Sequence, residues 1–342
     1  MNLEQSLHDF QSRLHEIGSS LSLPAEDGLQ SLLDRALSAL ENESPLYRPK
    51  DDSSRPGGLL DFSSGRLPVV IVPDIHARAD FLLRLADSRL TETGETVLEL
   101  LDKEAVTVVC VGDAVHSESR AYSRWIEGYR DWEAGVYAGP AMQKEMAENF
   151  STLEIIMEMK IRFPGHFHFL KGNHENVLNE TEHGNFAFRK FVQEGSMCRD
   201  FIRQVYGDVI LHLISLWEKS LPVCAVFSDF GVSHAEPREA YPRRRIINCH
   251  AEGNEDVIAG LTWTRNDEAD ADSVQGLIQE LIPGSARKGA AWFGGHRPVQ
   301  ECSRYNLRQN GKFLQLHNPE EMNVALVVPG TQFDPETDIK SV

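Results

Sequence analysis

The chain has 342 residues, of which 41% are hydrophobic and 25% are charged, and this composition excludes a disordered or fibrous protein. It carries 52 acidic against 34 basic residues, and a net charge of −18 disfavours binding to long nucleic acid because like charges repel. The cysteines form no CxxC pattern and no apolar run approaches about 18 residues, so we expect reduced thiols in a cytoplasmic protein without a membrane span.

Residues 1 to 58 are predicted as a helical hairpin followed by a linker. Apolar residues recur at spacings of three and four, the period of a helix, and Pro24 separates two such stripes. A polar stretch from 43 to 58 with Pro and Gly is typical of a linker. The hairpin can be a cap on its own catalytic domain, which we favour because the stripe is short, or the contact of a homodimer. The stripes are Leu3, Leu7, Phe10, Leu14, Ile17 and Leu21, then Leu29, Leu32, Leu33, Ala36, Leu37 and Leu40.

Residues 59 to 342 are predicted as an α/β catalytic domain. Short apolar or β-branched runs have the length of strands, and stretches with a helical period lie between them. This alternation is typical of α/β proteins, in which functional groups lie on loops at strand ends. The predicted strands are 69–72, 106–111, 167–170, 223–227, 291–293 and 323–328; the predicted helices are 79–90, 146–161 and 185–216, the last broken near Gly207.

Five short motifs carry side chains suited to metal binding. Asp74 and His76 are two residues apart, so on an extended segment both can reach one cation. The carboxylate of Asp113 can bridge two cations, because each oxygen can bind a different ion. The motifs are PDIHA at 73–77, GDAVH at 112–116, GNHE at 172–175, SHAEP at 233–237 and GGHRP at 294–298.

The remaining motifs supply further oxygen and imidazole ligands. Asn173 offers an amide oxygen, and His234 and His296 each follow a strand-like run. The neighbouring His174 points elsewhere, so it can transfer a proton while Asn173 binds an ion. Two hard cations about 4 Å apart, held by Asp, Asn and His, polarise a phosphoryl oxygen and lower the pKa of a bridging water. The order of all five motifs therefore predicts a binuclear metal site.

In these motifs the chain resembles the calcineurin-like metallophosphoesterases, specifically the bacterial members of the phosphoprotein phosphatase branch. That branch has D-x-H, GD-x-x-D, GNHE and two later histidines, and the resemblance runs from about residue 67 to 329, including LTWTR at 261–265. It implies a four-layer α/β/β/α sandwich, with two mixed β-sheets flanked by helices. It also implies that Asp74, His76 and Asp113 bind one metal ion, while Asp113, Asn173, His234 and His296 bind the other.

The resemblance further implies a phosphatase with two divalent or trivalent metal ions, manganese first and iron or zinc as alternatives. A metal-bridging hydroxide would attack phosphorus in line, and His174 would protonate the leaving oxygen as general acid. Arg265 would hold the phosphate beside Asn173, because a guanidinium group matches two phosphate oxygens. Pro298 stands where diesterases of the superfamily have a second metal-binding His, which favours phosphate monoesters.

One motif departs from the family pattern. The family reads GD-x-x-D-R-G, in which the second Asp orients the catalytic His and the Arg binds phosphate; this chain has His116 and Ser117 there. We expect the longer segment that follows, 117 to 148, to be an inserted amphipathic helix packed on the domain. The alternative is a lid in which Arg120 or Arg124 replaces the missing phosphate-binding Arg. His116 is either a substitute partner for His174 or a bystander near the metals.

Three functions stay open at this level. The first is a phosphomonoesterase acting on phosphoserine or phosphothreonine proteins or on small phosphate esters, and the second is a diadenosine polyphosphate or nucleotide hydrolase. The third is a catalytically impaired scaffold that acts as a binding module, which the complete ligand set disfavours. The expected partner is thus a phosphorylated protein or a small phosphorylated metabolite or nucleotide. Other histidines, among them His168 and His317, lack ligand spacing and are expected at the surface or in satisfied core positions.

Overall fold

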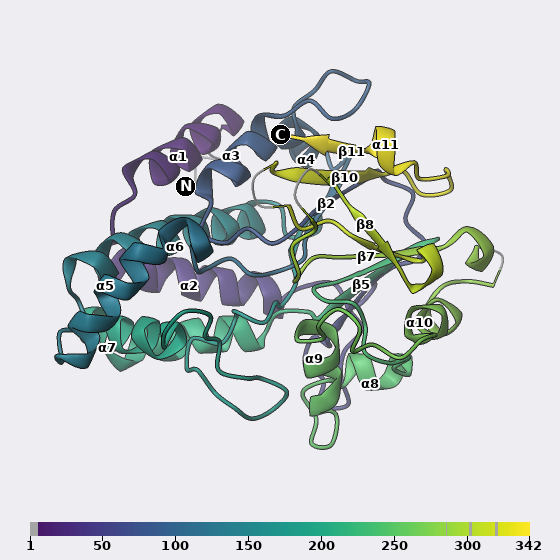
Figure 1. Ribbon diagram of the computed structural model, residues 1–342. Helices are drawn as coiled ribbons and strands as arrows, with labels where there is room; N and C mark the ends of the chain where they lie inside the picture. Colours follow the sequence, from purple (N-terminus) through teal and green to yellow (C-terminus); the bar gives the residue numbers. More distant parts are fainter. Residues whose placement is uncertain (1–5, 285, 301–302, 319–320) are drawn as a thin grey trace.

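The computed structural model describes residues 6–284, 286–300, 303–318 and 321–342, and its strands form two mixed sheets (Figure 1). The first sheet has the order β1 (Leu59–Phe62), β5 (Cys224–Phe227), β6 (Phe230–Ser233), β7 (Ala291–Gly294), β9 (Phe313–Gln315) and β8 (Asn306–Arg308). The second has the order β11 (Ile339–Ser341), β10 (Asn323–Val327), β2 (Val69–Val72), β3 (Thr107–Cys110) and β4 (Phe167–Phe169). Each predicted strand corresponds to one of these, within one or two residues at its ends.

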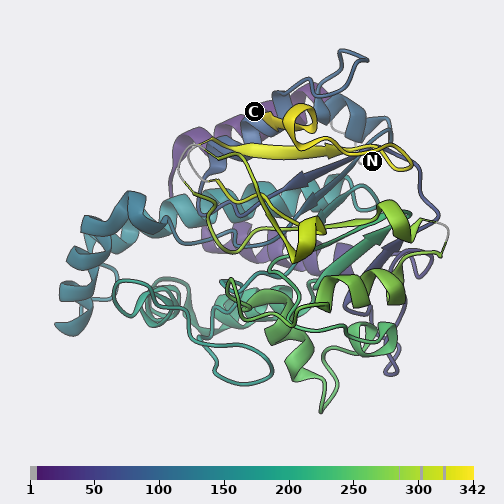
Figure 2. The same ribbon diagram turned by 45° about the vertical axis from the view of Figure 1, so that its right-hand side comes forward.

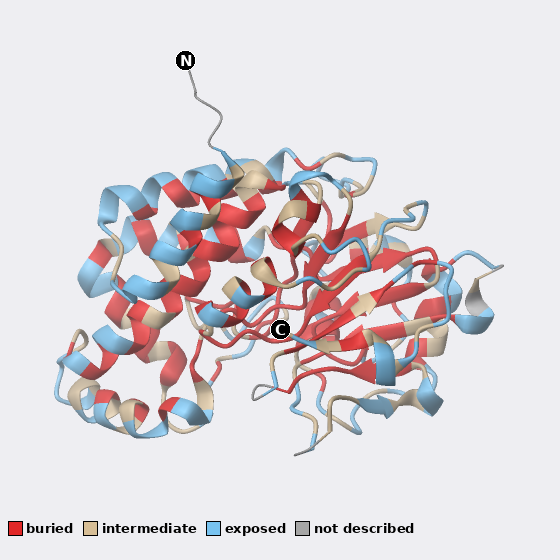
Figure 3. Cartoon of the chain, turned by 90° about the horizontal axis from the view of Figure 1, so that it is seen from above, coloured by how far each residue is buried: buried red, intermediate tan, exposed pale blue. Residues whose placement is uncertain are grey.

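The apolar side chains divide into three clusters, one for each interface between four layers. Side chains alternate along a strand, so Val70 and Val72 of β2 face the helices while Val69 and Ile71 face the other sheet. The middle cluster joins the two sheets, and the outer clusters join each sheet to its helices. Buried residues accordingly follow the strands, and exposed residues follow the outer sides of the helices (Figure 3). The predicted α/β/β/α sandwich is confirmed.

The helices are unequally divided between the two sides. Against the second sheet lie α1 (Leu7–Ser20), α2 (Glu26–Glu41), α3 (Ala79–Asp87), α4 (Val97–Asp102), α6 (Pro140–Arg162) and α7 (Glu194–Lys219). The first sheet is covered by α8 (Arg243–Ile247), α9 (Glu255–Thr262) and α10 (Ser273–Leu281), and α11 (Pro335–Asp338) precedes β11. None of the described helices is both long and apolar enough to cross a membrane.

Helix α7 confirms the predicted break but begins later than predicted. Gly207 interrupts it with φ 78° and ψ −179°. Residues 185 to 193 are not helical, because the carboxylate of Glu194 accepts the backbone N–H groups of Lys190, Phe191 and Val192 and so caps the chain before the helix starts.

The two N-terminal helices pack on other helices of their own chain and have few contacts with each other, so they are not a mutually packed hairpin. Helix α1 contacts α3 and α6, and α2 contacts α6 and α7 (Figure 1). The stripe residues Phe10, Leu14 and Leu33 are buried in the largest apolar cluster, whereas Leu3 lies outside the described residues. This packing favours the cap over a dimer contact, and the homodimer stays a prediction.

Residues 43 to 58 are not the loose linker that their polarity predicts. Glu43 and Arg48 are buried and form an ion pair, and Glu43 also binds Lys160 of α6. The ring of His168 in β4 lies 3.3 Å from the same carboxylate. Buried charges are tolerated when each has a partner, so this segment is fixed to the sheet and to α6. The four described cysteines are buried free thiols, and Cys302 lies outside the described residues.

The segment 117 to 148 contains a short turn, η1 (Glu118–Ala121), then α5 (Tyr122–Glu133) and the start of α6. Helix α5 packs on α6 and α7 at the edge of the helical layer (Figure 2). Its Trp125 is completely buried. The segment is therefore a packed helix rather than a free lid. The two remaining short turns are η2 (Arg287–Gly289) and η3 (Gln309–Gly311).

Candidate active site

The five motifs meet where strands of the two sheets end. Asp74 follows β2, Asp113 follows β3 and Asn173 follows β4, and these three strands are parallel neighbours. In the other sheet, His234 follows β6 and His296 follows β7, which are also parallel. Since the carboxyl ends of parallel strands lie at one edge of a sheet, side chains far apart in sequence come together there.

Four of the predicted ligands have the spacing of a metal shell. The Asn173 Oδ1 atom lies 2.8 Å from His296 Nδ1 and 2.9 Å from His234 Nε2, and the two ring nitrogens are 3.2 Å apart. Asp113 Oδ2 lies 3.5 Å from His234 Nε2. Ligands about 2.1 Å from one ion lie about 3.0–3.4 Å from one another, so these atoms fit around a single cation.

The other predicted ligands form an adjoining group. His76 Nε2 lies 3.8 Å from Asp113 Oδ2, while its Nδ1 lies 3.2 Å from the carbonyl of Val115, which leaves Nε2 free to bind an ion. Ligand atoms of Asp74, His76 and His317 all lie within 4.8 Å of one another. His317 is buried, as one of its two expected positions requires, but its Nδ1 atom has no hydrogen-bond partner among the described residues, so it is not the satisfied core histidine that was expected.

The loops that carry these ligands have an unusual backbone. His76, Asp113 and His296 have positive φ values of 49°, 54° and 63°, which side-chain-bearing residues adopt at an energetic cost. Glu175 offsets this cost, since its carboxylate accepts the backbone N–H groups of Asp113, Ala114 and Gly172 at 2.9, 2.9 and 2.7 Å. The motif residue Glu175 thus ties the second motif to the third, a role that sequence reasoning missed.

Glycine is required where these two loops touch. A Cβ atom on Gly112 would lie 2.4 Å from the backbone nitrogen of Gly172. This distance is too short for any side chain, so the second and third motifs pack backbone against backbone at Gly112 and Gly172.

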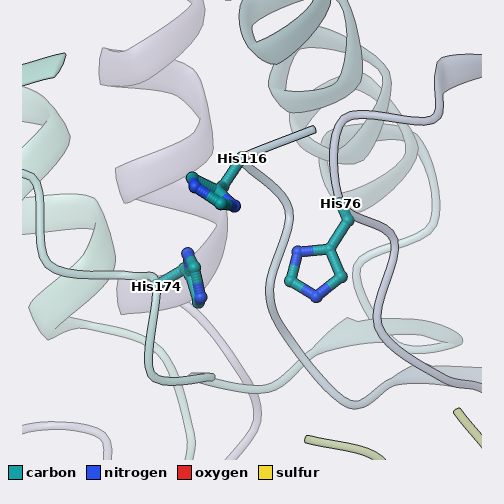
Figure 4. A group of neighbouring side chains, drawn as sticks. All are labelled: His76, His116 and His174. Carbon is teal, nitrogen blue, oxygen red and sulfur yellow. The ribbon is translucent and has the colours of Figure 1, made fainter. Parts of the chain in front are cut away.

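His174 lies beside the carboxylate of Asp113. Its Nε2 is 3.8 Å from Asp113 Oδ2, and its backbone N–H donates to Asp113 Oδ1 at 2.9 Å. The rings of His76, His116 and His174 lie close together, with one nitrogen of each within 4.8 Å of the others (Figure 4). The side chain is 12% exposed, which gives it access to a bound substrate. This is the place that a proton donor to a leaving oxygen requires.

His116 occupies the position of the family's second Asp. Its ring lies 5.0 Å from that of His174 and stacks on Trp125 at 4.7 Å. Its Nε2 is 3.8 Å from Glu194, and proximity to His116 helps to hold the pKa of Glu194 at about 2 despite burial. A His and Glu pair therefore stands where the family has a single Asp.

The electrostatics of the site favour a bound cation. Burial lowers the pKa of His76, His174 and His234 well below its usual value and lowers that of His296 to about 3, so these rings are neutral with a free lone pair. Burial also raises the pKa of Asp74 and Asp113. A cation would stabilise both carboxylates in their ionised form, and the donor set therefore fits a metal.

Arg120 and Arg124 do not face the predicted ligands. Arg120 binds Glu148 at 2.6 Å and the backbone carbonyls of His76 and Ala77. Arg124 binds Glu145 and Glu148 at 2.6 Å each, and Ser117 at 2.9 Å. The alternative of a phosphate clamp is therefore not supported, because Glu148 of α6 engages both guanidinium groups and the buried Glu145 also engages that of Arg124. The two arginines instead fix the first two motifs to α6.

Arg265 lies in a pocket next to His296. The pocket has a volume of about 450 Å³, and its lining includes Arg189, Arg238, Trp263 and Phe186. The charge of Arg265 contributes to the low pKa of His296, whose ring also bonds the backbone of Trp263. Within the described residues, Arg189 and Arg238 have no acidic partner within ion-pair distance. Sequence reasoning missed both, and only their shared positive charge could have pointed to them.

One acidic side chain also approaches the site. Glu118 Oε1 lies 3.7 Å from His76 Nε2, and Lys190 binds the same oxygen at 2.7 Å. In the family pattern this position is the Gly of GD-x-x-D-R-G. The pair therefore places both a carboxylate and an ammonium group at the rim of the site.

Comparison with known proteins supports the fold. No protein-family model and no curated protein sequence matches the chain. Among solved structures it is similar to a protein serine/threonine phosphatase from Saccharomyces cerevisiae that resembles human PP5, with TM-score 0.57, 14% identity, and coverage of 93% of this chain and 88% of that one.

Two further solved structures are less similar. A cold-active protein-tyrosine phosphatase from a psychrophilic Shewanella has TM-score 0.46 at 16% identity, covering 80% of this chain and 77% of its own. A putative diadenosine tetraphosphatase has TM-score 0.40 at 17% identity, covering 84% and 97%. The match to the yeast protein shows that this chain has the fold of that serine/threonine phosphatase, in agreement with the fold that its motifs predict.

Proposed function

We propose that the chain is a metal-dependent phosphatase that hydrolyses phosphate monoesters at the site between the two sheets. The observation that carries the proposal is the convergence of Asp113, Asn173, His234 and His296 with the separations of ligands around one ion. Asp74 and His76 adjoin this group, because Asp113 Oδ2 lies 3.8 Å from His76 Nε2 as well as 3.5 Å from His234 Nε2. We infer two ions, manganese first, with iron or zinc as alternatives.

Each side chain then has a chemical role. When bound, two cations supply Lewis-acid activation of water and of the phosphoryl group. Asp113 lies between the two ligand groups and can hold both ions. His174 is placed to give a proton to the leaving oxygen, which contributes about 10²- to 10⁴-fold to the rate. Glu175 keeps Asp113 in its strained backbone conformation.

Arg265 is the proposed phosphate-binding residue. Its guanidinium group is exposed and has only a loose ion pair, 4.0 Å from Glu268. It is therefore available to bind two phosphate oxygens in a fork. Ser117, at the position of the family's other phosphate-binding Arg, is bound to Glu145 and Arg124 and cannot replace it.

A second candidate substrate class is nucleotides, including dinucleoside polyphosphates. Phe186 and Trp263 meet edge to face at 5.4 Å in the pocket beside Arg265, and half of Phe186 is exposed. Aromatic faces bind nucleobases, and Arg189 and Arg238 would bind additional phosphates. Either substrate suits a protein of charge −18 better than long nucleic acid does. A phosphorylated protein remains a proposed partner. The cytoplasm remains the proposed location.

One parallel assay tests the proposal. Phosphopeptide, aryl monophosphate, aryl diester and dinucleoside polyphosphate are offered to the protein loaded with Mn²⁺, next to the variant Asp113→Asn. We expect turnover of the monophosphate that the variant lowers by at least about 10³-fold, because the bridging ligand is lost. A folded, metal-loaded protein with no turnover above the variant would instead indicate a binding module. A preference for the diester would contradict the monoesterase.

A further inference from the structure

We propose that His317 is a ligand of the metal ion bound by Asp74 and His76. It would supply, from a neighbouring strand, the imidazole that Pro298 removes from the GGHRP motif. The inference rests on the proposed metal centre and adds one residue to it, from a part of the chain that has no metal-binding motif.

The register of the first sheet brings His317 to the site. Strands β7 and β9 are parallel, with Gly294 opposite Gln315, and Leu316 continues the pairing by donating to the Gly294 carbonyl at 2.9 Å. Two residues beyond the last pair, His317 therefore stands beside His296. The backbone N–H of Val299 donates to the His317 carbonyl at 2.8 Å and fixes this position. The end of β9, which is parallel to β7, thus places the imidazole of His317 beside His296 although no second motif is present.

The atoms that would bind the ion are buried and lack other partners. The side chain of His317 is 1% exposed and that of Asp74 is 0% exposed. His317 Nδ1 and Asp74 Oδ2 face each other at 3.4 Å, and neither has a hydrogen-bond partner within the part of the chain that the structure describes. Buried polar atoms almost always have a partner, because leaving them without one costs about 1–3 kcal/mol each. A distance of 3.4 Å is long for a hydrogen bond but suits two ligands of one ion.

His76 completes the group. Ligand atoms of Asp74, His76 and His317 lie within 4.8 Å of one another, and Asp113 adjoins them through His76. With His317 the first ion has four protein ligands, as many as the second. The absence of a His at position 298 then says nothing about the coordination number of this ion. Pro298 therefore no longer favours phosphate monoesters over diesters as substrates, and the substrate assay must distinguish the two.

Metal binding, not activity, tests this inference. Manganese is titrated into metal-free protein by calorimetry, and bound metal is counted by mass spectrometry after gel filtration, for the wild type, His317→Ala and His317→Gln. His212→Ala, at an exposed position of α7, is the matched control. We expect two ions on the wild type and the control. The His317→Ala variant should keep one tight ion and bind the other at least about 10-fold more weakly, with His317→Gln in between.

A thermal unfolding measurement guards against a folding defect. Without metal, His317→Ala should unfold at a lower temperature than the wild type, because loss of a fully buried imidazole leaves a cavity, so each protein is compared with its own metal-free form. With Mn²⁺, its gain in melting temperature should be smaller than that of the wild type. Equal affinities and equal gains would overturn the role of His317 while leaving the metal centre intact. A wild type that binds no ion would overturn the proposed function itself.

Discussion

At the residue scale, the proposed metal ligands depend on neighbouring side chains that are not themselves proposed ligands. Glu175 accepts three backbone N–H groups from two loops, and His116 and Glu194 stand behind His174 where the family has one Asp. Positive φ at Asp113 persists because these contacts hold the loop. In the proposed site, His116 and Glu194 thus stand where the family pattern has the Asp that orients the proposed general acid His174, while all the proposed metal ligands are present.

The variant Glu175→Gln tests this support. An amide must present its NH₂ group to one of the backbone N–H donors, so we expect the free energy of unfolding to fall by about 2–3 kcal/mol, measured by urea titration. Manganese affinity should fall as well, because Asp113 loses its fixed position. Glu252→Gln, at an exposed position, should change stability by less than about 0.5 kcal/mol. Equal stability of the two variants would contradict the role of Glu175 in holding the two loops together.

At the element scale, the motifs and six of the eleven described strands were predicted from sequence, because both depend on local patterns; β1, β6, β8, β9 and β11 were not among the predicted strands. The run 69–72 is apolar on both faces and is β2, and Asp74 and His76 follow it directly. His317 could not be found in this way, since its place depends on the pairing of β9 with β7. The one local signal was a His directly after the strand-like run 313–316. Likewise, Arg120 and Arg124 looked available because their partners, Glu145 and Glu148, lie on another helix.

Two glycines test how α7 and α2 are built. Gly207 has φ 78° and ψ −179°, a conformation open essentially to glycine alone, so Gly207→Ala should destabilise the protein by about 1–3 kcal/mol. Gly28 is an exposed position of α2 where an added Cβ meets nothing within 4 Å. Gly28→Ala should therefore stabilise the protein by about 0.5–1 kcal/mol. Thermal unfolding should show a lower melting temperature for Gly207→Ala and a higher one for Gly28→Ala. Shifts in the same direction would refute this description of α7.

At the scale of the whole molecule, a buried ionic cluster joins the N-terminal region to the sandwich. Glu43, just after α2, forms ion pairs with Arg48 of its own segment and with Lys160 of α6. It also lies beside His168 of β4. Burial alone would raise the pKa of Glu43, but Lys160 and the neighbouring groups hold it far below 4.5. The N-terminal helices are thus held by charge as well as by their apolar side chains.

The pH dependence of stability follows from this lowered pKa. The contribution of Glu43 is fully present above its unfolded pKa, near 4.5, and is lost as the pH falls below that value. We expect Glu43→Gln to lose about 3–5 kcal/mol at pH 7, because Lys160 and Arg48 keep buried charges without their partner. The loss should shrink between pH 4.5 and pH 3 in urea titrations. Parallel stability curves for the wild type and the variant would contradict this role.

The central claim is that two metal ions and this ligand set make a phosphatase. Its most direct test is to measure aryl phosphate turnover while Mn²⁺ is added in known equivalents to metal-free protein at a protein concentration well above Kd. The account predicts that turnover rises until about two ions per chain are bound and then stays constant. Turnover that needs no metal, that is complete at one ion per chain, or that never appears in the fully loaded protein would contradict it.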